Sequence, residues 1–211
     1  MRRPCHIAAS VAVLILTACN SAKTPNDANF TKAVNAYLTK HGAACTVIGR
    51  QFPIDLPRSE QNGQYGIGPK LAVLEQAGLT HSSDTTAVVH GLLDPLRGAG
   101  QAQPVKRYEL TESGKKYFQQ IPGALGQTSG FCYRQKSVDA IVKWTEPTTA
   151  GASTQAEATY TYKIVDTAPW AQRPDVQRAF PEIQATLNGA SKTNQVVGLE
   201  LTNKGWEVPG A

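Results

Sequence analysis

Hydrophobic positions recur with helical spacing in three stretches of the chain. In the first, apolar side chains repeat at i, i+4, i+7 and i+8, which predicts a helix from Asn29 to Gly42. In the second, Pro69–Ala77, a proline stands in the first turn and Gly78 follows the last apolar position, as is typical of helix ends. The third stretch, 176–187, contains Pro181, so a kinked helix or two short helices are expected.

Alternating apolar and polar positions predict strands, most of them in the second half of the chain. The clearest alternation covers 138–145 and 158–165, and we expect the Thr-, Ala- and Ser-rich stretch 147–157 between them to be a long, solvated loop. The polar, glycine-bearing stretch 58–68 is also expected to be a loop. Shorter or looser strand patterns cover 45–54, 85–93, 105–110, 131–134 and 197–201.

These patterns predict an α+β protein of two parts. A small helical front subdomain with a pair of strands is expected over 30–122, and a β-rich back subdomain over 131–208. In the back subdomain we expect an antiparallel sheet packed on the interrupted helix at 176–187. A length of 211 residues and a hydrophobic fraction of 41% agree with a globular chain of this kind.

The first residues, 1–18, have the pattern of an export signal. Arg2 and Arg3 precede a short apolar run, and small residues lead to Cys19. The run is too short to cross a bilayer as a conventional helix. The tetrapeptide Leu16–Cys19 resembles the lipobox of bacterial lipoproteins, which implies that cleavage leaves Cys19 as a lipid-modified first residue. The alternative is an ordinary secreted protein in which Cys19 is a plain thiol.

The lipobox resemblance implies both a location and a partner. Lipid on Cys19 would hold the chain at a membrane, because two or more acyl chains give stable anchoring. Residues 19–29 are polar and are expected to form a tether. Asn20, where enteric lipoproteins of the inner membrane carry an aspartate, favours the outer membrane. We therefore expect a protein of the cell envelope that is anchored in the outer membrane and faces the periplasm.

The charge of the chain argues against a nucleic-acid partner. The formal net charge is +5, and loss of the signal would reduce it to +3, because Arg2 and Arg3 leave with it. So small a charge is not the footprint of a nucleic-acid-binding protein. We expect only weak attraction to anionic lipids or cell-wall polymers.

Two of the four cysteines remain once Cys5 and Cys19 are accounted for by the signal and the lipid. The periplasm is oxidising, so we expect Cys45 and Cys132 to form a disulfide. A redox pair or a metal pair is disfavoured, because neither cysteine belongs to a C-x-x-C sequence and no histidine lies at ligand spacing from either one.

Part of the front half resembles a winged-helix module. The helix end with Gly78-Leu79 and the later sequence Tyr108-Glu109-Leu110-Thr111-x-x-Gly114 carry this resemblance. It implies a helix followed by a hairpin wing whose basic groups would be Lys106, Arg107, Lys115 and Lys116. Because an exported protein rarely meets DNA, such a module would be reused for binding a protein, and the basic residues also fit a solvated face.

No sequence pattern identifies catalytic or metal-binding residues. His81-Ser82-Ser83-Asp84 holds triad residue types, but neighbouring residues do not converge as a triad does, so a polar turn is expected. Gly66-x-Gly68-Pro69-Lys70 lacks the spacing of a phosphate loop and fits a helix start. The remaining histidines show no metal-ligand spacing, and we expect neither a metal nor a cofactor.

Aromatic residues are concentrated in the back half, where most are expected to form the core. Trp170 and Trp206 lie outside the predicted strands and are the candidates for a ligand groove. The back half as a whole resembles proteobacterial envelope lipoproteins to which no activity is assigned. The expected function is that of a non-catalytic, membrane-anchored lipoprotein that binds a protein or an envelope polymer. The alternative is an envelope hydrolase whose catalytic residues the sequence does not reveal.

Overall fold

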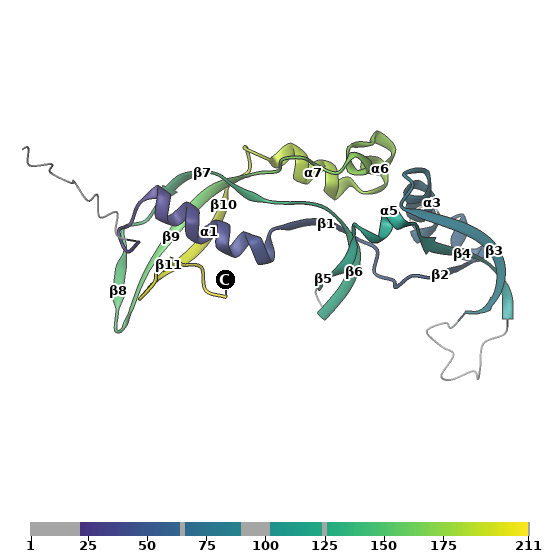
Figure 1. Ribbon diagram of the computed structural model, residues 1–211, viewed down its shortest axis with the longest axis horizontal. Helices are drawn as coiled ribbons and strands as arrows, with labels where there is room; N and C mark the ends of the chain where they lie inside the picture. Colours follow the sequence, from purple (N-terminus) through teal and green to yellow (C-terminus); the bar gives the residue numbers. More distant parts are fainter. Residues whose placement is uncertain (1–21, 64–65, 90–101, 124–125, 211) are drawn as a thin grey trace, which may run out of the picture.

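Three antiparallel sheets follow one another along the long axis of the molecule (Figure 1). The computed structural model describes residues 22–63, 66–89, 102–123 and 126–210. Helices and antiparallel strands are both abundant in this part of the chain, so the α+β class is confirmed. No helix in it has the length and apolar character needed to span a membrane.

The C-terminal sheet has the strand order β11-β10-β9-β7, with β8 paired to the start of β9. Its strands are β7 (Ser137–Trp144), β8 (Thr148–Ala150), β9 (Ser153–Lys163), β10 (Gln195–Thr202) and β11 (Gly205–Glu207). Helix α1 (Asp27–His41) packs on one face of this sheet, where Phe30 makes edge-on contacts with the rings of Trp144 and Trp206. Asn26 caps the helix by accepting the backbone N–H of Asn29 at 2.9 Å.

The middle sheet has the order β1-β6-β5 and joins the two ends of the molecule (Figure 1). It consists of β1 (Ala43–Val47), β5 (Phe118–Gly123) and β6 (Gly126–Gln135). Cys45 and Cys132 lie directly opposite each other in β1 and β6 and form a disulfide, as predicted. Because β1 follows α1 closely and β7 follows β6, this sheet is continuous in sequence with the C-terminal sheet.

The front lobe stands at the other end of the molecule. Its sheet has the order β2-β4-β3, and two helices lie between its first two strands in the sequence. The elements are β2 (Ile54–Pro57), α2 (Arg58–Gln61), α3 (Ile67–Gln76), β3 (Thr80–Val88), β4 (Ala102–Leu110) and α5 (Glu112–Lys115). The short helix α2 occupies part of the stretch 58–68 that was expected to be a loop.

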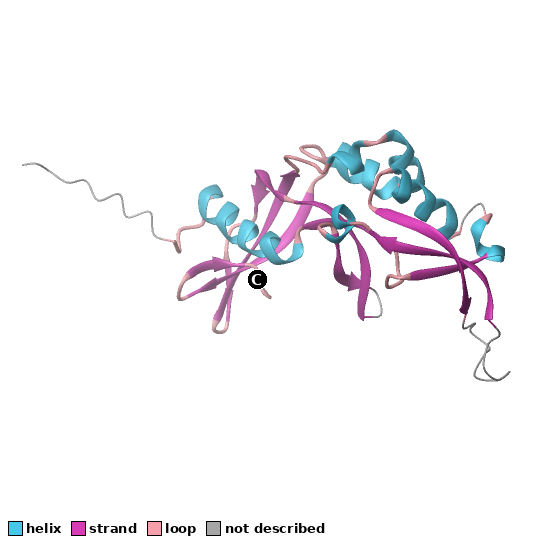
Figure 2. Ribbon diagram, turned by 45° about the vertical axis from the view of Figure 1, so that its right-hand side comes forward, coloured by secondary structure: helices cyan, strands magenta, loops and turns pink. Residues whose placement is uncertain are grey.

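The helical segment around Pro181 does not cover the C-terminal sheet, contrary to expectation. It forms two short helices, α6 (Pro174–Ala179) and α7 (Pro181–Gly189), preceded by the 3-10 helix η1 (Pro169–Gln172). Their buried apolar side chains, Val176, Phe180 and Ile183, join the core of the front lobe and middle sheet, and α6 contacts α3 (Figure 2). The helix that packs on the C-terminal sheet is instead α1, so the N-terminal helix does not belong to the front part of the molecule.

The stretch 147–157 is a β-hairpin and not the long loop that was expected. Strand β8 pairs with the start of β9, with Thr149 opposite Thr154. Gly151 in the turn has a positive φ of 61°, a conformation that glycine adopts without strain. The threonines that made the segment look like a solvated loop are also good strand formers, so the turn at Gly151 decides the structure.

The Thr111–Gly114 sequence has a clear structural role in the front lobe. Thr111 donates its hydroxyl to the carbonyl of Gly78 at 2.7 Å and accepts the N–H of Gly114 at 2.9 Å. It thereby joins the end of α3 to the start of α5. Gly114 lies so close to Leu79 that an added Cβ would be 1.9 Å from the Leu79 carbonyl oxygen. Only a glycine fits at this contact.

We therefore expect Gly114→Ala to destabilise the protein. The new Cβ would meet backbone that cannot move without separating α3 from α5, and overpacking of this kind costs about 1–3 kcal/mol. The free energy of unfolding, measured by urea denaturation, should fall by that amount. Gly63→Ala is the matched control, because the nearest atom to its Cβ would be 3.9 Å away. Equal stability of the two variants would contradict this account of Gly114.

Candidate functional site

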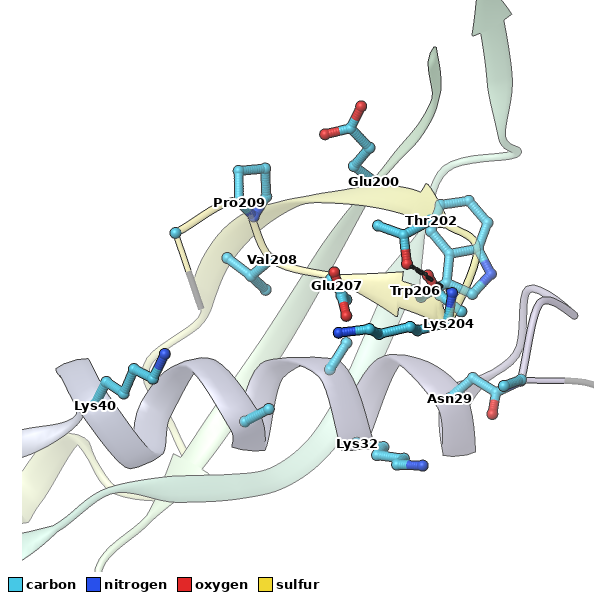
Figure 3. A pocket seen from close by; sticks show the side chains of 15 residues that line it. Asn29, Lys32, Lys40, Glu200, Thr202, Lys204, Trp206, Glu207, Val208 and Pro209 are labelled. Atoms are coloured by element: carbon cyan, nitrogen blue, oxygen red, sulfur yellow. Dashed lines mark hydrogen bonds between the residues drawn. The ribbon is translucent and has the colours of Figure 1, made fainter. Parts of the chain in front are cut away.

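A cavity of about 530 Å³ lies between α1, the β10–β11 hairpin and the C-terminal residues (Figure 3). Helix α1 supplies one wall, from Asn29 to Lys40, and β11 with the tail supplies the other. Small and apolar side chains form its floor, and charged ones lie at its rim. The lining comprises Ala22, Asn29, Lys32, Ala33, Ala36, Lys40, Glu200, Thr202, Lys204, Gly205, Trp206, Glu207, Val208, Pro209 and Gly210.

The first described residues of the chain are fixed to the rim of this cavity. The indole Nε1–H of Trp206 donates to the carbonyl of Lys23 at 3.0 Å, and the Asn29 amide donates to the carbonyl of Thr24 at 2.8 Å. Gly205 has φ +123°, and a Cβ there would lie 2.7 Å from the carbonyl oxygen of Ala22. The segment 22–26 is thus docked, and α1 begins at Asp27, so the expected tether at 19–29 is folded over most of its length.

Lysines outnumber carboxylates around the cavity, but the charges do not converge on one point. Lys40 points toward the C-terminal tail, whereas Lys32 points away from the hairpin (Figure 3). Glu200 points away from α1 and accepts the Ser153 hydroxyl at 2.7 Å. The lining has no histidine or cysteine, and no nucleophile stands beside a base. This geometry can hold a ligand or a chain segment.

A second hollow, of about 520 Å³, lies on the front lobe between α2 and the strands β3 and β4. It is mainly polar, and Arg58, Asp84 and Lys106 are its charged residues. Beside it, Arg107 makes a two-pronged ion pair with Asp55 across β4 and β2, at 2.7 and 2.8 Å. Hydrogen bonding from Arg107 lowers the pKa of the Asp55 carboxyl below its ordinary value.

Trp170 and Trp206 are the sequence-predicted candidates for a ligand groove. In the structure they do not share one. Both are 5% exposed, and they lie in separate cores. Trp170 is surrounded by the rings of Tyr117, Phe131 and Tyr133 in the core of the front lobe and middle sheet. Trp206 packs on Phe30 and lines the cavity beside α1. Sequence position alone could not show that Trp170 is buried by α6 and by strands far away in the chain.

His81-Ser82-Ser83-Asp84 lies within strand β3 and not in a turn. His81 is beside Glu109, 3.4 Å from its carboxylate, while Ser82 donates both its N–H and its hydroxyl to Glu75. Alternation along the strand places these residues on opposite faces of the sheet, so they do not converge. No three His, Cys, Asp or Glu side chains gather as metal ligands in the described ranges. Cys19 and His90 lie outside those ranges.

The basic residues of the expected wing are distributed among different contacts. Arg107 pairs with Asp55, and Lys115 pairs with Glu112 at 2.6 Å. Of the four basic residues of the expected wing, Lys106 is the one that lines the hollow on the front lobe. Sequence reasoning missed its neighbour Arg58, as well as Lys32, Lys40 and Lys204 at the other cavity. Isolated basic residues carry no signal of their own until the fold brings them together.

Comparisons with protein-family models, with curated proteins and with solved structures found no match for this chain.

Trp206→Phe should loosen the docked N-terminal segment. The substitution keeps an aromatic ring against Phe30 but removes the N–H that binds the Lys23 carbonyl, a loss of about 1 kcal/mol. Hydrogen exchange of the amides of 22–26 should become faster. Trp170→Phe is the matched control, because the Trp170 indole N–H has no partner among the described residues. Equal rates of amide hydrogen exchange in 22–26 for the two variants would show that Trp206 does not hold this segment.

Asp55→Asn should change the response of stability to acid. A carboxyl whose pKa is lowered by folding stabilises the protein above its unfolded pKa, and this stabilisation is lost as the pH falls through the folded value. Both partners are partly exposed, so the effect should be modest. We expect a lower urea midpoint than the parent at pH 7 and a smaller difference near pH 2. Asp139→Asn, at an exposed site, is the control and should follow the parent at both pH values.

Proposed function

We propose that this protein is a non-catalytic lipoprotein of the bacterial cell envelope, anchored through Cys19 in the outer membrane, which binds a protein partner with its front lobe. One observation carries the proposal. The docked segment 22–26 and the front lobe stand at opposite ends of an elongated molecule (Figure 1). Such a shape suits a protein that is fixed at one end and makes contacts at the other.

The docked segment would hold the folded part close to the membrane. Cys19 precedes Ala22 by three residues, so the chain between them spans at most about 10 Å. The acyl chains of a lipidated cysteine contribute about 0.8 kcal/mol per buried CH₂, and two or more chains anchor a protein stably. The C-terminal sheet would then rest near the bilayer surface, and the front lobe would stand further into the periplasm.

The topology of the front lobe supports its assignment as a winged-helix-like module. Helix α3 is followed by the antiparallel pair β3 and β4, which agrees with the helix and hairpin that the resemblance of the sequence implies. Helix α3 is the one that would enter a DNA groove in that family. Here α3 packs on α6, and the Lys70 ammonium lies 5.1 Å from the centre of the Phe180 ring. A helix covered in this way favours a protein partner over a nucleic acid.

The hollow on the front lobe is the proposed contact. Its two cations, Arg58 and Lys106, against one acid, Asp84, favour an acidic segment of the partner. Arg107, beside the hollow, is already paired with Asp55. Arg58 and Lys106 are therefore the residues best placed to meet a partner carboxylate.

The proposal predicts two separable effects in cells. Cys19→Ser should move the full chain from the membrane pellet to the soluble fraction, because the acylation site is lost.

A photo-crosslinking residue at Asn62, on the rim of the front hollow, should capture one protein partner. Arg58→Glu with Lys106→Glu should reduce that capture about tenfold or more, since two favourable charges become repulsive.

The controls separate the anchor from the contact. The same photo-crosslinker at Asn203, in the turn of the opposite end, should not capture this partner. Lys163→Glu with Lys192→Glu changes the net charge equally at exposed positions elsewhere and should leave capture intact. Membrane retention of the Cys19→Ser chain would contradict anchoring through Cys19. Capture of cell-wall polymer instead of protein would contradict protein binding at the front hollow, and so would capture that the charge reversal does not reduce.

A further inference from the structure

Three edge strands in the described part of the protein, β7, β3 and β5, carry a feature that blocks pairing with another chain. Strand β7 has two irregularities of register, and its Val138 N–H is taken by the side chain of Asn35. In β3, the Ser82 N–H is taken by Glu75. Strand β5 contains Pro122, which has no N–H to offer. Bulges, prolines and side-chain caps of this kind are the usual protection of sheet edges.

The outer edge of β10 has no such protection. Residues 195–200 pair with β9 on the inner side, but β11 pairs on the outer side only with 200–202. This leaves 195–199 with a strand neighbour on one side only within the described ranges. The sequence there, Gln-Val-Val-Gly-Leu, has no charge, no proline and no bulge. Val196 is 61% exposed, more than any other large hydrophobic residue in the described part.

We infer that this edge pairs with the same edge of a second copy of the chain, antiparallel about a two-fold axis at Val197. Such a pairing would place Val196 of each copy opposite Gly198 of the other. In the register of β10 and β9, Val196 and Gly198 lie on the same face of the sheet, the face away from α1. Gly198 has open space where a side chain would be. The exposed valine of one copy therefore covers the gap at the glycine of the other.

Described contacts bound the unpaired segment at both of its ends. At one end the segment is bounded by β11, which already occupies the outer side of 200–202. At the other end the chain before β10 turns inward, and the Ser191 N–H donates to the Tyr162 carbonyl of β9 at 2.7 Å. The segment with no strand neighbour on its outer side, 195–199, is thus five residues long in each copy. An interface that contacts itself in this way closes as a dimer and does not extend.

Charge also favours a second copy over a charged partner. The paired segments carry no ionisable side chain, so antiparallel pairing brings no like charges directly together. The contact area of two short strands is below that of a stable interface, so the dimer should be weak in dilute solution. Confinement of both copies to one membrane would raise their effective concentration and strengthen the pairing.

Cysteine cross-linking of the full chain tests both the dimer and its register. Val197→Cys places a thiol opposite its own copy, where the two Cβ atoms would be about 5 Å apart. Val196→Cys places it opposite Gly198, two positions from its own copy. After mild oxidation of intact membranes, Val197→Cys should give a reducible dimer band at about five times or more the level of Val196→Cys or the parent chain.

A second pair of substitutions tests whether the edge itself is responsible. Adding Val196→Lys to Val197→Cys should abolish the dimer band, because an edge lysine opposes strand pairing. Adding Val142→Lys, at another valine about half exposed but on the irregular strand β7, should leave the band unchanged. Cross-linking of Val197→Cys no stronger than that of Val196→Cys would overturn the proposal. So would a dimer band that Val196→Lys does not reduce.

Discussion

The pairing of β1 with β6 holds the three sheets of this protein in one line. Strand β1 follows α1, which packs on the C-terminal sheet, and β6 leads into β7 of that same sheet. The disulfide between Cys45 and Cys132 closes the pair covalently. It joins positions 87 residues apart, and a loop of that length corresponds to about 4–5 kcal/mol of unfolded-state entropy in the chain-entropy model. Loss of this pairing would separate the C-terminal sheet from the front lobe.

Helix α7 strengthens the same junction from one side. Glu182 accepts the hydroxyl of the fully buried Thr46 in β1, and the Thr186 carbonyl accepts the Tyr162 hydroxyl of β9 at 2.8 Å. Next to this helix, Lys136 lies between β6 and β7 with its ammonium 4.5 Å from the centre of the Tyr162 ring, and burial lowers its pKa. Hydrogen-bonding groups on one short helix thus connect the middle sheet to the C-terminal sheet. A joint built in this way supports an extended shape without a single large core.

Local patterns in the sequence were sufficient for most of the elements and for the disulfide. The interrupted helix at Pro181, the stop at Gly78 and the strands around Val138 and Tyr160 all follow from periodicity and from Pro and Gly chemistry. What the sequence could not supply is which element packs on which. Helix α1 meets strands more than a hundred residues later, and the apolar face of α6 fits α3 as well as it would fit a sheet. The docking of segment 22–26 also depends on a distant residue, Trp206, so composition made it look like a free tether.

The packing of the first helix on the last strands has a consequence for how the chain acquires its structure. Phe30 is completely buried, yet two of the residues that bury its helix, Trp206 and Val208, come far later in the chain. During synthesis helix α1 therefore has no completed partner surface, and its apolar face stays open until Trp206 and Val208 have been made. A chain organised in this way cannot finish folding from its N-terminus onward. Helix α1 and the C-terminal sheet therefore complete their packing together, after the strands of that sheet have been made.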